Sequence, residues 1–381
     1  MKGPQEDKMA FRLVPGSRRV QAAAIAVVAL FLAAAAGPAD AQAIIKVNEN
    51  VNVKFGILLQ PQALFDEIPA GTTGTNGYAE SFFLRRARLL VGGQVAKNVF
   101  FFMETDNARL GQKSSATTNL GSGFQLLDAV GEWRIAKEFN ILGGLLRVPY
   151  SREAMKASGS EFQIDFQAFA YVQASALGFT GGNRDTGFQF RGYALEDHLE
   201  WRATATQGFR QSNSKNSFLY TGRVQYNIFD TEVYNMPSYP GSYRGSKKIL
   251  ALGAAYQTQG NYKYASGDVY ASIPVPSGAV EGTLQYQYVD GGKLFPTLAQ
   301  QNIYMVEAGW YGKKSKVGPW ARYEKAFYSG AESRNEQRIW GGLGYWLFGT
   351  NFNIKAAYQR IMPKVAVDRN QFILQLQFYY F

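Results

Sequence analysis

The most constraining feature of this sequence is an alternation of apolar and polar residues that recurs in segments of roughly ten residues. In one such segment Leu199, Trp201 and Ala203 alternate with Glu200 and Arg202. Successive side chains of a β-strand point to opposite faces, so a segment of this kind has one apolar face and one polar face. Clusters of Gly, Asn, Asp, Ser, Lys or Pro separate the segments and are typical of turns. The pattern predicts a series of short strands joined by turns.

The chain after residue 41 contains about sixteen such segments. They lie near 51–66, 79–95, 99–108, 123–136, 139–147, 185–195, 199–208, 217–228, 248–258, 264–274, 279–289, 301–311, 317–327, 336–347, 352–362 and 369–381. No apolar run there is long enough for a transmembrane helix. The prediction is an all-β fold, a transmembrane antiparallel β-barrel over residues 42–381. A secreted soluble sandwich or propeller is the alternative, and it is disfavoured because the chain ends on Phe381 and shows no blade repeat of about 40 residues.

Residues 1–41 have the organisation of a secretory signal peptide. Basic residues come first, Ala22–Ala36 is a small apolar run, and Ala39-Asp40-Ala41 supplies a small-x-small cleavage site. A membrane anchor is the alternative, but the apolar run is shorter than the ~20 residues that a spanning helix needs. Removing residues 1–41 takes away five basic and three acidic residues, which leaves 35 and 26 and a net charge of +9.

Composition argues against several classes of function. The chain has no Cys and a single His, which excludes thiol catalysis and disfavours most His-dependent chemistry. We find no zinc spacing, nucleophile elbow or phosphate-binding loop, so we expect neither an enzyme nor a cofactor. The net charge of +11 predicts attraction to anions. Nucleic acid is an unlikely partner class because no recognition motif accompanies the arginines.

The connections between the predicted strands alternate between short and long. Tight turns such as Ala96–Asn98 fit the periplasmic end of a barrel, and longer connections at 67–78, 109–122, 148–184 and 290–300 fit the external end. The third external connection, 148–184, is rich in aromatic residues, and we expect it to fold inward and narrow the pore. An external lid is the alternative. The long segment 229–247 stands where a tight turn is expected, and the sequence offers no reason for it.

Three arginines interrupt the apolar stretch Phe82–Gly93. An arginine facing lipid near the bilayer midplane costs about 2–4 kcal/mol, so these residues are expected to face a water-filled interior. Arg85 and Arg86 are adjacent, and a regular strand would point them to opposite faces. We therefore predict a β-bulge or local twist that turns both inward, or else burial of Arg85 at a subunit contact.

Assigning the less apolar face of each strand to the interior, and adding polar residues of the third connection, gives a set of candidate pore and anion-binding residues. They are Arg85, Arg86, Arg88, Asp128, Arg147, Arg152, Lys156, Ser158, Ser160, Arg191, Arg202 and Arg223. Guanidinium groups bind phosphate and carboxylate in two-point fashion, so this set favours anions. In the alternative interpretation nearby acids such as Glu104, Asp106 and Glu132 balance these bases.

Several motifs of the chain resemble the phosphate-selective porin O and P family of Gram-negative outer membranes. They are Phe83-Leu84-Arg85-Arg86-Ala87-Arg88-Leu89 followed by Val91-Gly92-Gly93, Leu127-Asp128-Ala129, Gly143–Tyr150 with Glu153, and the closing strand Leu376–Phe381. The resemblance implies a sixteen-stranded barrel, usually trimeric, with an inward-folded third loop and an arginine-lined constriction.

The resemblance also assigns positions. The paired arginines of the constriction match Arg85 and Arg86, and the acidic residue of the next hairpin matches Asp128 approximately. Lys156, Ser158 and Ser160 are inexact counterparts of the loop residues that coordinate phosphate. Where the family has an arginine at the end of the loop, this chain has Asp165-Phe166-Gln167.

Together these features predict an outer-membrane porin of a Gram-negative bacterium, exported by its signal peptide into the outer-membrane lipid bilayer, and the family resemblance implies a homotrimer. It would pass small hydrophilic solutes, with small phosphate-like anions favoured. A non-conducting structural or scaffold barrel, plugged by 148–184, is the alternative function.

Overall fold

The fold was taken from a computed structural model of the chain, which describes residues 44–68, 77–114, 117–118, 123–212, 216–233 and 238–381. The expected signal peptide lies outside these residues, as do parts of the external connections 67–78 and 109–122. Within the described residues no helix has the length and apolar character needed to cross a membrane.

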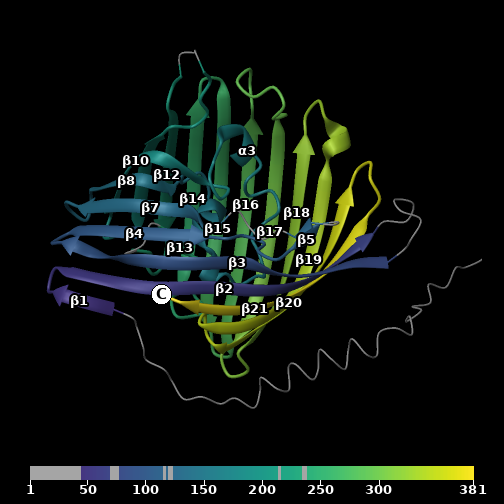
Figure 1. The fold of residues 1–381 in the computed structure, drawn as a ribbon, viewed down its shortest axis with the longest axis horizontal. Coiled ribbons are helices and arrows are strands. Elements are labelled where there is room, and N and C mark those ends of the chain that lie inside the picture. Colours follow the sequence, from purple (N-terminus) through teal and green to yellow (C-terminus); the bar gives the residue numbers. More distant parts are fainter. Residues whose placement is uncertain (1–43, 69–76, 115–116, 119–122, 213–215, 234–237) are drawn as a thin grey trace, which may run out of the picture. The chain divides into compact units, whose positions relative to one another are not determined.

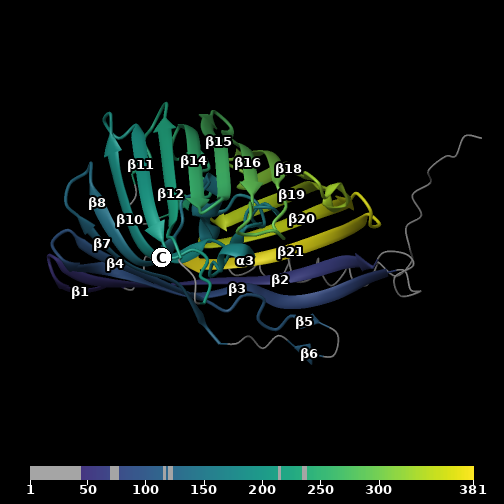
Figure 2. The same ribbon diagram turned by 90° about the horizontal axis from the view of Figure 1, so that it is seen from above.

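Among the described residues, sixteen long strands follow one another around an antiparallel barrel. They are β2 (Val51–Ile68), β3 (Gly77–Ala96), β4 (Val99–Asp106), β7 (Gln125–Arg134), β8 (Asn140–Arg147), β10 (Arg184–Ala194), β11 (Leu199–Thr206), β12 (Leu219–Asn227), β14 (Ile249–Gln259), β15 (Tyr262–Val275), β16 (Gly278–Asp290), β17 (Gln301–Gly312), β18 (Val317–Tyr328), β19 (Glu336–Phe348), β20 (Phe352–Pro363) and β21 (Arg369–Tyr380). Every predicted strand is present, with its ends shifted by a few residues. Each pairs with its neighbours in sequence, and β2 pairs with β21 to close the barrel, as Figures 1 and 2 show in purple and yellow.

Smaller elements accompany the barrel. They are the edge strand β1 (Ile44–Asn48), which pairs with β2, the two-residue strands β5 (Lys113–Ser114), β6 (Thr117–Thr118), β9 (Lys156–Ala157) and β13 (Tyr239–Pro240), the helices α2 (Arg152–Met155) and α3 (Ala174–Leu177), and the 3-10 turns η1 (Ser158–Ser160) and η2 (Glu332–Arg334).

Alternation places polar side chains inside the barrel and apolar side chains outside. In β12, Thr221, Arg223 and Gln225 are buried, whereas Tyr220 and Val224 are exposed. A soluble protein buries the opposite set, so this polarity excludes a water-surrounded barrel and fits one whose outer surface is covered by lipid. The soluble sandwich or propeller considered from the sequence is therefore wrong.

Buried glutamine pairs join the first and last strands at the seam. Gln60 of β2 donates to Gln377 of β21 at 2.8 Å, and Gln62 donates to Gln375 at 3.1 Å. Each hydrogen bond is worth about 0.5–1.5 kcal/mol, and each also satisfies amides that would be costly to leave unpaired. These inward-facing amides add side-chain bonds to the backbone ladder that closes the barrel.

The side chain of the last residue, Phe381, lies on the inner face of the barrel. Phe372, Leu374 and Phe378 share one parity, and Phe381 has the other, which a bulge or a tyrosine pair at the membrane interface would reconcile. The pairings of β21 with β20 and β2 contain no register shift. Instead the Phe381 ring lies on the inner face, 5.6 Å from the Phe102 ring, with the Lys54 Nζ atom 4.8 Å from its centroid.

Candidate functional site

The bulge predicted at the paired arginines is present. Leu59 of β2 pairs with Ala87 of β3, and Pro61 pairs with Leu84, so Gln60 alone stands opposite two residues, Arg85 and Arg86. An extra residue in one strand breaks the strict alternation of side chains. Both guanidinium groups reach the same partner, which a regular strand would not allow.

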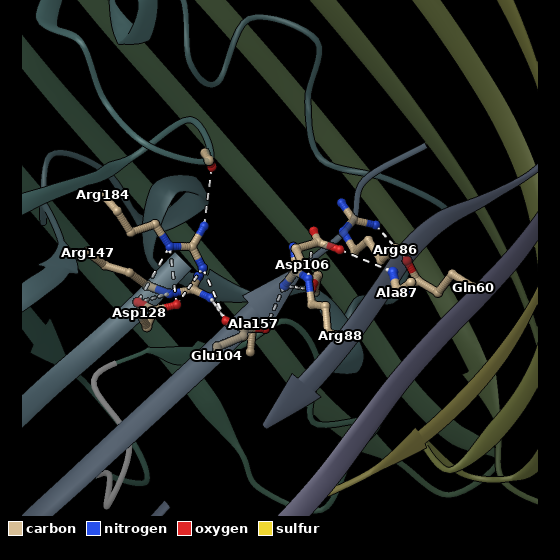
Figure 3. Close-up of polar contacts among 12 residues, drawn as sticks. Gln60, Arg86, Ala87, Arg88, Glu104, Asp106, Asp128, Arg147, Ala157 and Arg184 are labelled. Carbon is tan, nitrogen blue, oxygen red and sulfur yellow. Dashed lines mark hydrogen bonds and ion pairs between the residues drawn. The ribbon is translucent and has the colours of Figure 1, made fainter. Parts of the chain in front are cut away.

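That partner is a carboxylate of the 148–183 connection. Arg85 Nε lies 2.6 Å from Asp165 Oδ2, and Arg86 Nη2 lies 2.7 Å from Asp165 Oδ1. Arg86 also donates to Gln60 Oε1 at 2.8 Å, and its guanidinium carbon lies 5.1 Å from the centroid of the Phe166 ring. Figure 3 shows Arg86 beside Gln60. Burial by itself would raise the pKa of Asp165, but the two arginines outweigh it and hold that pKa below its usual range. Asp165 is therefore ionised at neutral pH.

A second cluster gathers three arginines around acids of β4 and β7. Arg88 lies 2.7 Å from Glu104 and 2.9 Å from Asp106, and Arg184 lies 2.9 Å from Asp128. Arg147 lies 3.4 Å from Glu104 and 3.8 Å from Asp128. Figure 3 shows Asp128 and Glu104 beside Arg147 and Arg184, and Asp106 beside Arg88. Ser158 joins this cluster, because its Oγ accepts a hydrogen bond from Arg88 at 2.9 Å.

A third cluster surrounds Tyr239. The guanidinium carbons of Arg152, Arg202 and Arg223 lie 4.9, 5.2 and 5.6 Å from the centre of its ring. Each of these arginines has its own carboxylate. Arg152 pairs with Glu232 at 2.8 Å, Arg202 with Glu200 at 2.6 Å and Arg223 with Asp268 at 2.7 Å.

The other candidate residues have partners as well. Lys156 Nζ lies 2.8 Å from Glu153 and 3.1 Å from Glu161, and Arg191 pairs with Glu132, separately from the clusters above. Ser160 Oγ donates to the Ala157 carbonyl and accepts from the Gly241 amide. Each of the nine predicted basic residues thus lies within ion-pair distance of a carboxylate. At these positions acids balance the bases in the structure. This was the alternative interpretation of the sequence.

The described residues of the 229–247 segment, whose length the sequence alone does not explain, contact the third connection. Its β13 pairs with β9 of the 148–183 connection, and Gly241 donates to Ser160 at 2.8 Å. Glu232 and Tyr239 of this segment are completely buried and belong to the Tyr239 cluster. Tyr239 and Glu232 thus supply partners to side chains on the inner faces of β11 and β12.

The 148–183 connection contacts inward-facing side chains of widely separated strands. The backbone amide of Arg152 donates a hydrogen bond to Asp268 Oδ2 of β15 at 3.1 Å. Ala168 donates to Glu324 of β18 at 2.7 Å. Lys355 of β20 donates to the carbonyls of Glu161 and Gln163, and Gln377 of β21 donates to the carbonyl of Gly159.

An apolar patch and a cavity lie along the inner wall beside these contacts. Leu58, Leu90 and Phe102 form the patch together with Tyr379 and Phe381. The adjoining cavity has a volume of 680 Å³ and is lined in part by Lys54, Phe100, Arg134, Ser160 and Ser238. Within the described residues, no group of three or more His, Cys, Asp or Glu side chains could hold a metal ion.

Comparison with known proteins identifies a family of outer-membrane porins, in agreement with the barrel and its polar interior. The sequence profile of the phosphate-selective porin O and P family matches residues 53–268, which is more than half of the chain. The chain belongs to this porin family. A search of curated proteins by sequence finds no match. The family and the fold together point to an outer-membrane channel rather than an enzyme.

Solved structures of outer-membrane proteins share the porin's fold at low identity. OmpF of Salmonella typhi, solved with daunomycin, is 14% identical, with 88% of this chain and 100% of that chain covered and a TM-score of 0.60. The outer membrane channel DcaP of Acinetobacter baumannii is 13% identical, with 88% and 99% covered and a TM-score of 0.57. OprB of Pseudomonas putida is 8% identical, with 86% and 94% covered and a TM-score of 0.56. At such identities the likeness concerns the fold alone.

Several residues of these clusters were not among the predicted site residues. Arg184 is an even number of residues away from the exposed Phe188 and Phe190 on the same strand, so alternation predicts that its side chain faces lipid. In the structure Arg184 is buried and pairs with Asp128. Asp165, Glu232 and Tyr239 lie in connections, where no periodicity indicates which way a side chain points. For these residues the sequence contains one indication, which is the position of Asp165 where the related family has an arginine.

Proposed function

We propose that this porin forms a water-filled, constricted channel through which small hydrophilic solutes diffuse, with anions favoured. The observation that carries this proposal is the inside-out barrel: polar and charged side chains line its interior, and apolar side chains cover its outside. An interior of that kind stabilises water and polar solutes, whereas the apolar outside is stable only in contact with lipid.

The constriction is assigned to two segments, 148–183 and 229–247. Support comes from the hydrogen bonds of the first segment to side chains on β15, β18, β20 and β21, and from the pairing of β9 with β13. A connection that contacts inward-facing side chains of several strands would narrow the space inside the barrel, which supports this assignment. The external lid considered from the sequence would leave these wall residues without those partners.

The preference for anions rests on the arginine pair. Arg85 and Arg86 share one carboxylate, so this group carries a net positive charge, whereas the arginines of the Tyr239 cluster have one carboxylate each. The side chains of Arg85 and Asp165 are about one-fifth exposed, so solvent reaches the pair. A positive group exposed on a pore wall raises the local concentration of anions.

A non-conducting scaffold barrel remains the second candidate, and the dense bonding of the 148–183 connection favours it. Arg152, Glu153 and Lys156 of that connection are almost completely buried, as in a plug. The cavity of 680 Å³ on the inner wall argues the other way, because charged and aromatic residues line a space large enough for a solute.

Planar-bilayer recording of the purified protein separates the two functions. A porin gives steady ohmic steps, and its reversal potential in a KCl gradient has the sign of anion selectivity. A scaffold barrel gives no steps even when the protein is shown to be folded by its heat-modifiable mobility on gels. A cation-selective reversal potential would contradict the charge argument while leaving the porin proposal intact.

Export and assembly complete the proposal. Cleavage after Ala41 predicts that the protein isolated from outer membranes begins at Gln42, which N-terminal sequencing tests. Resemblance to the family implies a homotrimer, which would migrate as an SDS-resistant band that chemical cross-linking converts to three subunits. A mature protein that retains residues 1–41 would contradict the signal-peptide assignment.

A further inference from the structure

The arginine pair has the geometry of an oxyanion-binding site. Two guanidinium groups converge on two oxygens of one group, with N–O distances of 2.6 and 2.7 Å. Planar guanidinium groups match carboxylate and phosphate oxygens in this way, and the bonds are strengthened by charge. The β-bulge opposite Gln60 lies at Arg85 and Arg86, and it allows both side chains to point to the same carboxylate.

The group that occupies this point belongs to the chain itself. Asp165 comes from the 148–183 connection, 79 residues beyond Arg86 in sequence. Its Oδ1 atom also accepts from its neighbour's amide, Phe166 N, at 3.0 Å. Its side chain is 20% exposed, so a dissolved anion can approach the same two arginines from solvent. The two arginines carry twice the charge of the single carboxylate, which leaves the site attractive to a second anion.

We propose that Asp165 is an internal counter-anion that fills an oxyanion site made by Arg85 and Arg86, and that the site binds dissolved phosphate when Asp165 is removed. Only the conductance test of this inference rests on the proposed function. Phosphate binding can be measured on the folded protein in detergent without any channel activity. In the native protein Asp165 competes with dissolved oxyanions, so the pair attracts anions without holding them tightly. Permeation needs binding that is weak enough to allow exit.

The decisive variant is Asp165→Asn, which keeps the shape of the side chain and removes its charge. A unit charge about 4 Å from a permeating ion is worth about fivefold in local concentration in water. The anion-to-cation permeability ratio from reversal potentials should therefore rise about fivefold at low salt. Inorganic phosphate should block chloride current at a concentration at least several-fold lower than in the native protein. Asp165→Glu should behave as the native protein does.

Two controls make these outcomes specific. Asp368→Asn removes an acid from an exposed pair with Arg360, where both side chains are more than two-fifths exposed, and should leave both readouts unchanged. Arg85→Gln/Arg86→Gln in the Asp165→Asn background should abolish the gain in phosphate block. Asp165→Ser provides a second route to the same charge change if the asparagine variant folds poorly.

Calorimetric titration of inorganic phosphate into the folded Asp165→Asn protein in detergent tests the site apart from conductance. Phosphate binding that the double arginine substitution removes supports the proposal, even if no channel is recorded and the proposed function fails. A variant that conducts all ions better, without phosphate binding or block, overturns it, because Asp165 would then serve only to anchor the connection to β3.

Discussion

The arginine pair and the Tyr239 cluster contain similar side chains in opposite circumstances. In the Tyr239 cluster three buried arginines have three carboxylates, and the side chains of Arg152 and Glu232 are both 0% exposed. At the pair, two arginines share Asp165, which is 20% exposed. Both groups look like anion sites in the sequence, but only the second has excess positive charge in contact with solvent. The number of acids per arginine and the access of water distinguish a structural group from a functional one.

The largest expected difference between the two groups is in stability. Glu232→Gln removes the carboxylate that pairs with the buried Arg152, and breaking a buried ion pair costs about 3–5 kcal/mol. Asp165→Asn should cost less, because solvent reaches Arg85 and Asp165, which are 21% and 20% exposed, although Arg86 is only 3% exposed. Urea unfolding of the refolded protein in detergent, followed by tryptophan fluorescence, measures both. Equal losses of unfolding free energy for the two amide substitutions would show that solvent access does not distinguish the arginine pair from the Tyr239 cluster.

The second difference concerns ion selectivity. Arg85→Gln/Arg86→Gln removes two positive charges and leaves Asp165, so the charge of the group changes from +1 to −1. The anion-to-cation permeability ratio should therefore fall by roughly fivefold for each charge removed. The matched control is Glu200→Gln/Arg202→Gln, which removes a base and an acid together from the Tyr239 cluster. Reversal potentials in a KCl gradient should be unchanged by the control. A larger shift in the control than in the arginine pair would assign selectivity to the Tyr239 cluster instead.

A smaller effect should separate the two contributions of Tyr239. Tyr239→Phe removes the hydrogen bond from its hydroxyl to Glu200, 2.7 Å long, at a cost of about 1 kcal/mol. Tyr239→Ala also removes the ring that three guanidinium groups contact, each contact being worth about 0.5–1 kcal/mol or more. Unfolding free energies in detergent should therefore rank native, phenylalanine and alanine in decreasing order. A phenylalanine variant as unstable as the alanine variant would assign the whole effect to the hydroxyl group.

The sequence was sufficient for the barrel and for the arginines of the arginine pair and of the Tyr239 cluster. Alternation encodes which face a strand residue occupies, and this is why β12 and the closing strand were placed correctly. The bulge followed from Arg85 and Arg86 being adjacent. The acids that complete the site could not be predicted in the same way, because Asp165 and Glu232 lie in irregular connections whose direction depends on tertiary contacts. Phe381 has the opposite parity to the apolar residues of the closing strand, and it lies on the inner face because β21 pairs without a bulge.

The smallest predicted effect involves a carboxylate in the connection that holds Asp165. Burial is the main cause that raises the pKa of Glu161, and the positive charge of Lys156, 3.1 Å away, opposes it only in part, so this pKa is about 7. A raised carboxyl pKa means that the protonated form fits the folded protein better, so any stability that Glu161 contributes is present at low pH and is lost as the pH rises through about 7. Above that pH the connection also gains one negative charge. Anion selectivity should therefore fall modestly, by less than the roughly fivefold effect expected at the arginine pair, when the pH rises across the neutral range. Glu161→Gln should remove this dependence in reversal-potential measurements, and a dependence that survives the substitution must come from another group.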